Sequence, residues 1–197
     1  MSSTQEMSTP RWSTTVADPA ALGLAGFAMT TFVLSLANVG LIPGAGSSVL
    51  GLALFYGGLA QLLAGMWEFV KGNTFGAVAF SSYGAFWLSF WWLLTNPEAA
   101  KAAGSAGVAA YLLAWTIFTA FMTIGAVKSS KVVLLVFIAL TLTFLALTIG
   151  EFAGSTVIHN IGGGLGLVTA LLAWYGAAAS VINSTWKRIV LPVGAPS

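Results

Sequence analysis

Few side chains in this sequence could carry out covalent chemistry. It has no cysteine, one histidine (His159) and five acidic residues, of which Glu6 and Glu98 fall in predicted tails or loops. An enzyme needs a nucleophile beside a base, or a cluster of metal ligands. No HExxH, GxSxG or paired acidic motif occurs in the apolar runs. We therefore predict that the protein is not an enzyme and needs neither a cofactor nor a metal ion.

Neutral polar side chains, in contrast, recur inside long apolar runs. No lysine or arginine lies deep in any run, so an anion passing there would depend on hydroxyls, amides and helix N-termini. The same hydroxyls also bond to the backbone of their own helix or join helices together, and the sequence leaves both interpretations open. The residues concerned are Thr30, Thr31, Ser35, Asn38, Gln61, Ser81, Ser82, Tyr83, Thr116, Thr119, Thr141, Thr143 and Thr148.

Two carboxylates mark the ends of apolar runs. Glu68 lies one turn before Lys71, near the predicted cytoplasmic end of its run, and Glu151 closes another run on the opposite side. Ionisable residues at such places often gate a pathway or relay protons, so both are candidate proton or gating residues. A local ion pair between Glu68 and Lys71 is the alternative. His159 is expected in an outer loop and is assigned no role.

The composition indicates an integral membrane protein. The 197 residues are 58% hydrophobic and only 6% charged, whereas an ordinary soluble domain has roughly 25% charged residues. The mean hydropathy is +0.93. A soluble fold could not cover its surface with so few charges. The net charge of +2 is small and scattered, which does not suggest a nucleic-acid partner.

Six apolar runs organise the chain as an all-α membrane bundle. Each is near the roughly 20 residues that a helix needs to cross about 30 Å of hydrocarbon. The predicted transmembrane domain is 18–184, between cytoplasmic tails at 1–17, which we expect to be disordered, and 185–197. Residues 152–160 are predicted to be partly irregular. The predicted spans are 20–42, 49–70, 75–94, 108–127, 132–149 and 165–182.

Loop charges predict the orientation of this bundle. With both termini in the cytoplasm, six of the seven basic residues lie inside and only Lys101 lies outside. This is a clear positive-inside bias. At the start of the first span, Asp18 and Pro19 are predicted to occupy the N-cap and the first helical position.

Several uncommon strings then occur in a recognisable order. They read DPAALGL at 18–24, FYGG at 55–58, KGNTFG at 71–76 and SYGAFW at 82–87. In these strings the sequence resembles the acetate uptake transporter family, also called the succinate–acetate permeases. The resemblance covers nearly the whole chain from residue 18 to 194. It departs from the usual pattern at Asp18, where the family has asparagine, and at Ala21, where it has proline.

The resemblance implies a fold and a set of site residues. It implies a six-helix protomer similar to proton-gated urea channels, assembled as a homo-hexameric ring with one pathway in each protomer. It also implies an apolar constriction of Phe27, Tyr83 and Leu140, with Asp18 as a helix cap at the pore mouth. Polar side chains expected along the substrate path are Thr30, Thr31, Gln61, Asn73, Thr74 and Ser82.

The function expected from this resemblance is transport of acetate and related small carboxylates across the cell membrane. Succinate as a substrate and coupling to protons are left open. Two alternatives stay in view: a passive channel for another small solute, such as urea or ammonia, and a membrane sensor that transports nothing.

Overall fold

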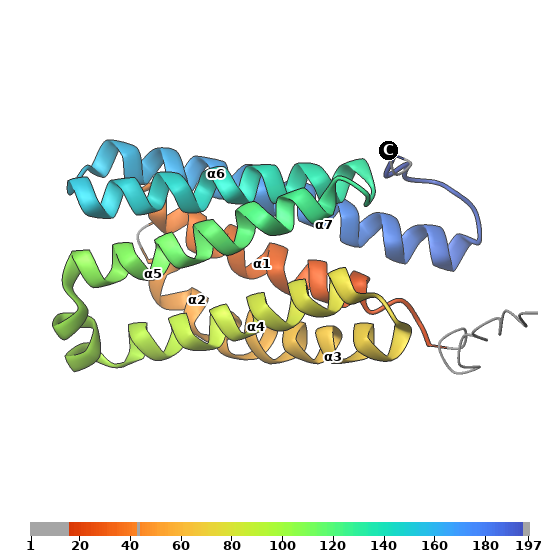
Figure 1. The fold of residues 1–197 in the computed structure, drawn as a ribbon, viewed down its shortest axis with the longest axis horizontal. Coiled ribbons are helices and arrows are strands. Elements are labelled where there is room, and N and C mark those ends of the chain that lie inside the picture. The colour runs from red at the N-terminus through yellow and green to blue at the C-terminus, as the bar shows by residue number, and fades with distance from the viewer. Residues whose placement is uncertain (1–15, 43, 195–197) are drawn as a thin grey trace, which may run out of the picture.

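The computed structural model describes residues 16–42 and 44–194, and this part of the chain is an all-helical bundle (Figure 1). The predicted N-terminal tail lies outside the described residues except for residues 16 and 17, as do residues 195–197. The elements are α1 (Ala20–Asn38), α2 (Ala45–Leu54), the π-helix η1 (Phe55–Ala60), α3 (Gln61–Lys71), α4 (Thr74–Thr95), α5 (Pro97–Ala126), α6 (Lys131–Ala153) and α7 (Thr156–Trp186).

Six helical segments of the described chain are long and apolar enough to cross a membrane, because α2, η1 and α3 run on as one segment from Ala45 to Lys71. Successive segments alternate in direction, and α1 runs through the middle of the bundle (Figure 1). It packs against α7, η1 and α3, while α6 packs against α5 and α7. Large apolar side chains such as Ile117, Phe121 and Ile124 are exposed on the outside. Such a surface suits lipid or another protomer.

The π-helix η1 interrupts the second span, a feature that the apolar pattern of the sequence does not predict. Its Gly57 lies so close to α1 that an added Cβ would stand 2.5 Å from Oγ1 of Thr30. On the facing side, a Cβ at Gly26 would stand 2.6 Å from the backbone oxygen of Tyr56. The two segments therefore approach at backbone distance, as small residues allow between membrane helices.

The last helix begins earlier than predicted. The side chain of Ser155 accepts a hydrogen bond from the amide of Ile158 and starts α7 at Thr156. The expectation of irregular structure at 152–160 is therefore wrong for most of this segment, and the glycines 162–164 lie inside the helix. A Cβ at Gly163 would stand 2.5 Å from the amide nitrogen of Val39. Gly163 thus serves the packing of α7 on the end of α1, while Gly162 faces Leu147 of α6.

Two further segments depart from the predicted loops. Helix α5 begins at Pro97, capped by the side chain of Asn96, and passes through a kink at Gly104 before it reaches the apolar run. After α7, residues 187–194 turn back along the bundle (Figure 1). Tyr175 donates a hydrogen bond to the carbonyl of Pro192, and the Val132 amide donates to the carbonyl of Val193. The C-terminal segment is therefore held against α6 and α7.

The start of α1 is tied to two other helices through Asp18. Pro19 takes the N-cap position, one residue later than predicted, and Asp18 Oδ1 accepts the Ala20 amide at 3.1 Å. The same oxygen lies 2.7 Å from Nζ of Lys71, and Ser180 donates to the other carboxylate oxygen. Partial burial opposes ionisation of Asp18, yet the hydrogen bonds and the charge of Lys71 outweigh it and lower the pKa of this carboxyl.

This linkage gives a stability test that depends on pH. Because the pKa of Asp18 is lowered on folding, its stabilising contribution is complete above the ordinary pKa of about 4 and is lost as the pH falls through the folded value. We expect Asp18→Asn to melt about 1–4 °C below wild type at pH 6, as for a partly exposed ion pair. The difference should shrink as the pH approaches 3. Melting of the purified proteins in detergent measures it.

Asparagine can still accept the Ala20 amide, so the substitution removes mainly the charge. Glu98→Gln is the matched control, since Glu98 is an exposed carboxylate in the first turn of α5. A difference between Asp18→Asn and wild type that stays the same from pH 6 to pH 3 would contradict the electrostatic account.

Candidate functional site

Within the described part of the bundle, a pair of neighbouring cavities share wall residues. The Asn73 cavity, of about 140 Å³, is lined by α1, α3, α4, α6 and the two turns around Asn73 and Ser129. The His159 cavity, of about 100 Å³, is lined by α1, α4, α5, α6 and the start of α7. Phe27 and Leu140 line both cavities. The two cavities are therefore neighbours, and these two side chains form part of the wall of each.

Aromatic side chains surround this shared wall. The rings of Phe27 and Tyr83 have centroids 5.8 Å apart, and Tyr83 also contacts Phe118 and Phe137. Its hydroxyl lies 2.9 Å from Oγ1 of Thr119 and so has a partner although it is buried. The sequence-predicted constriction residues Phe27, Tyr83 and Leu140 are thus brought together from α1, α4 and α6.

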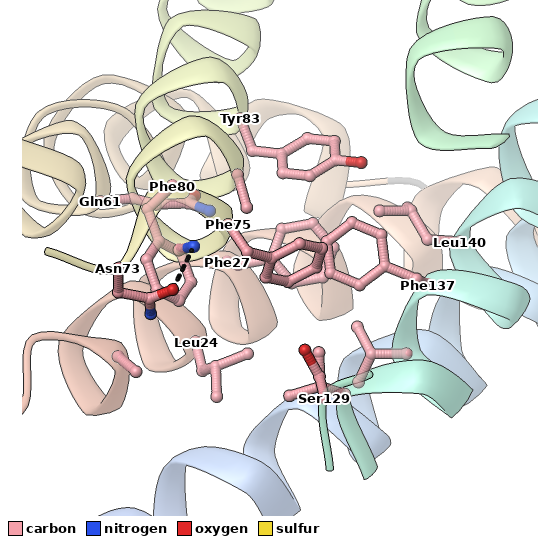
Figure 2. A pocket seen from close by; sticks show the side chains of 15 residues that line it. Leu24, Phe27, Gln61, Asn73, Phe75, Phe80, Tyr83, Ser129, Phe137 and Leu140 are labelled. Atoms are coloured by element: carbon pink, nitrogen blue, oxygen red, sulfur yellow. Dashed lines mark hydrogen bonds between the residues drawn. The ribbon is translucent and has the colours of Figure 1, made fainter. Parts of the chain in front are cut away.

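The Asn73 cavity has one polar side. In Figure 2, Gln61 and Asn73 lie on the opposite side of the cavity from Phe137 and Leu140. Asn73 Oδ1 accepts the Gly76 amide at 3.2 Å, which starts α4, and Asn73 Nδ2 donates to Glu68. Gln61 is buried, and its Oε1 has no hydrogen-bonding partner among the described residues. An unpaired carbonyl oxygen at a cavity wall is free to accept a hydrogen bond from a ligand or from water.

Glu68 lies behind this polar side and is fully buried. Its Oε2 accepts the hydrogen bond from Asn73 at 2.9 Å, while its Oε1 has no partner within the described part of the chain. A Cβ at Gly76 would stand 2.9 Å from its carboxyl carbon, so the glycine makes room for it. Lys71 forms its ion pair with Asp18, so the predicted alternative of a local ion pair between Glu68 and Lys71 is wrong.

The His159 cavity is lined by more hydroxyl and amide groups. Thr31, Ser35, Asn38 and Thr143 face it. The hydroxyl of Thr31 and the indole Nε1 of Trp87 are buried there without hydrogen-bonding partners among the described residues. Trp87 was not a candidate from the sequence, where a tryptophan in an apolar run looks like core or interface. Its indole N–H is a hydrogen-bond donor, and only the position of Trp87 at a cavity wall makes it a candidate ligand-binding group.

The same cavity contains an acid and an imidazole. Glu151, near the end of α6, and His159, in the first turn of α7, line it with Nδ1 and Oε1 3.4 Å apart. Glu151 is a candidate gating residue from the sequence, and it lines this cavity. The prediction that His159 lies in a loop is wrong, because Ser155 caps α7 ahead of it. The tight turn at Gly154 brings the two side chains together.

Not every predicted path residue lines a cavity. Thr30 points at Gly57 and donates to the carbonyl of Gly26. Thr74 is exposed in the first turn of α4. Ser82 lies one position before Tyr83 and is therefore turned by about 100° around α4 from it. Asp18 also lies outside both linings. The path residues that do line a cavity are Thr31, Gln61 and Asn73.

Several other threonines join helices. Thr116 and Thr148 connect α5 to α6 with oxygens 3.2 Å apart; because a hydroxyl has one proton, one of the two donates across this contact while the other donates to the carbonyl four residues before it. Thr143 and Thr169 connect α6 to α7 in the same way. The packing interpretation of the hydroxyls therefore holds for these residues, although Thr143 faces the His159 cavity as well.

Comparison with known proteins agrees with this architecture. Residues 2–195 match the GPR1/FUN34/yaaH family. The chain is 43% identical to the succinate-acetate/proton symporter SatP of Escherichia coli K12, over 92% of this chain and 97% of the symporter. It is 42% identical to acetate permease A of Emericella nidulans, over 90% of this chain and 65% of the permease.

A solved structure is similar as well. The structure of the bacterial acetate channel SatP superposes with a TM-score of 0.86 at 42% identity, covering 91% of this chain and 99% of that one. These relatives are a symporter, a permease and a channel, none of them an enzyme. The six membrane-length helices, the fold and the sequence together establish that this chain is a multi-pass membrane protein of the GPR1/FUN34/yaaH family.

Proposed function

We propose that the chain carries acetate and related small carboxylates across the cell membrane through the two cavities. The observation that carries this proposal is that the neighbouring Asn73 and His159 cavities share Phe27 and Leu140 as wall residues, inside a six-span bundle. The names of its relatives, a succinate-acetate/proton symporter and an acetate permease, support the same substrate class.

This shared wall suits a molecule with one apolar and one charged end. Removing water from a carboxylate costs many kcal/mol unless other groups replace the lost hydrogen bonds. A short apolar neck of Phe27, Tyr83 and Leu140 keeps the dry part of the path brief. The methyl group of acetate can contact these rings while the carboxylate still reaches polar groups on one side.

Polar groups on both sides of the neck can replace that water. Thr31 and Trp87 line the His159 cavity, and their donors have no partner among the described residues, so they are the groups that we propose to bond a carboxylate oxygen there. On the other side, Gln61 and Asn73 offer amide groups to the Asn73 cavity. The small solute therefore exchanges one set of neutral partners for another, and no fixed charge at the neck traps it.

Glu68 is the proposed proton site on the Asn73 side. Its carboxyl group is buried, keeps one oxygen without a partner and bonds to Asn73 in the cavity wall. A proton on Glu68 removes a negative charge beside the path of an anion. This charge change supports the coupling of carboxylate movement to protons.

We also propose a homo-hexameric ring with a pathway in each protomer and with both termini in the cytoplasm. Exposed apolar side chains on the outside of the described helices provide surface for neighbouring protomers and for lipid. The distribution of basic residues supports the orientation.

Flux measurements in proteoliposomes test the proposed function. We expect saturable uptake of labelled acetate above that of protein-free vesicles, which increases when an inward proton gradient is imposed. Unlabelled succinate should compete with acetate, and urea should not. A voltage imposed separately shows whether net charge moves. Passage of urea or ammonia without acetate would instead favour the alternative channel, and absence of any flux would favour a sensor.

Tyr83 tests the neck. We expect Tyr83→Ala to change the ratio of succinate to acetate flux by about tenfold, because removal of a ring widens an apolar passage. Tyr83→Phe is the matched control: it keeps the ring and loses only the bond to Thr119, so the ratio should stay near that of wild type. Flux is measured on protein of wild-type oligomeric size. An unchanged ratio in assembled Tyr83→Ala would remove Tyr83 from the neck.

Glu68 tests the proton site. Glutamine has nearly the same shape but cannot bind a proton, so Glu68→Gln should flatten the dependence of acetate uptake on pH. Initial rates between pH 5.5 and 7.5 measure this, with Glu98→Gln as the control for an exposed carboxylate. If the Glu68→Gln profile overlays that of wild type, the buried carboxyl has only a structural role.

A further inference from the structure

We propose that His159, oriented by Glu151, binds the carboxylate of the substrate at the His159 cavity, and that protonation of the imidazole makes this site available. The inference rests on the proposed function and assigns a specific residue and a switching condition to one end of the path. His159 is the binding residue in this proposal, and Glu151 is a positioning residue.

The pair is fixed in place by the crossing of α6 and α7. Gly150 is buried, and a Cβ there would stand 2.9 Å from the backbone nitrogen of His159, so the two helices touch at this point. The His159 amide bonds to the carbonyl of Ser155 in the first turn of α7. The imidazole therefore projects from a rigid part of the backbone into the cavity wall.

The contact within the pair leaves room for a third partner. The distance of 3.4 Å between Nδ1 and Oε1 exceeds the roughly 2.7–2.9 Å of a close charge-assisted hydrogen bond. The side chains of His159 and Glu151 keep 31% and 26% of their surface exposed. Both side chains line the cavity, so the pair is not closed off by packing.

Among the residues that the structure describes, no other titratable side chain lines this cavity. Helix α1 contributes Thr31, Ser35 and Asn38, α4 contributes aromatic side chains, and α5 contributes Val108 and Leu112. The charged residues on the first turns of α5, Glu98 and Lys101, are exposed and outside the lining. Protonation of the pair therefore sets the charge of this cavity wall.

The two protonation states act in opposite ways on an anion. With neutral imidazole, Glu151 gives the wall a charge of −1, which repels a carboxylate. With imidazolium, Nδ1–H faces Glu151, the pair is neutral, and Nε2–H can donate to the substrate. Histidine is the side chain that ordinarily changes charge between pH 5 and 8. Removing a unit charge about 4 Å from the binding position changes affinity by about fivefold when water fully screens the interaction.

The test is the apparent KM for labelled acetate in proteoliposomes with equal pH on both sides, so that the orientation of the protein does not matter. Between pH 7.5 and 6.0 we expect the wild-type KM to fall about fivefold. His159→Gln should have, at both pH values, the high KM that wild type has at pH 7.5. His159→Lys, with a permanent positive charge, should show the low value at both.

Glu151→Gln removes the repelling charge and should lower the KM at pH 7.5, while Glu98→Gln, outside the cavity, should follow wild type. If His159→Lys does not assemble, His159→Gln and Glu151→Gln decide the question. Acetate transport with a KM that is independent of pH, or a His159→Gln profile equal to that of wild type, would overturn this assignment alone. Absence of saturable acetate uptake by wild type would overturn the proposed function, and this assignment with it.

Discussion

The need to satisfy buried polar groups without help from lipid is the constraint on which this structure depends. Hydrocarbon offers no hydrogen bonds, so each hydroxyl, amide and carboxyl of a membrane helix must find a partner inside the bundle or face a water-accessible space. Threonines of α5, α6 and α7 meet this requirement by bonding to one another and to their own backbone. Thr31, Gln61 and Trp87 do not, and all three line a cavity. Two further groups without partners, on Glu68 and Ser81, belong to residues outside both cavity linings, so three of the five described residues with such a group line the proposed path.

Close helix packing places these groups along one axis. Glycines at the contact of α1 with η1, and at the contact of α1 with α7, let backbones approach to distances that a Cβ would prevent. Because α1 is held this tightly on both sides, Phe27 is fixed between the two cavities. The π-helix η1 provides the widened turn that presents Gly57 to Thr30. Such turns are frequent at functional sites, and here the turn immediately precedes Gln61.

Charge is distributed unevenly along the proposed path. The neck itself carries none, whereas a carboxyl group is found at each cavity: Glu68 behind Asn73 on one side and Glu151 beside His159 on the other. An anion that crosses such a path meets a group that can bind a proton before and after the apolar step. This arrangement suits a carboxylate whose movement responds to pH, because the repulsion at each mouth depends on protonation.

The sequence alone determined the membrane class, the all-α fold and the six spans, because hydropathy and segment length are local properties that lipid constrains directly. Its motifs also pointed to Phe27, Tyr83 and Leu140, which the structure brings together from three helices. Only the tertiary structure decided which polar residues face a cavity. Thr31 lines a cavity, whereas its neighbour Thr30 bonds to its own helix. Lys71 forms an ion pair with Asp18, so Glu68 bonds to Asn73 instead. Glu151 lies beside His159. Such assignments depend on which helix faces meet and how closely, and a neighbouring residue on a helix is turned by about 100°.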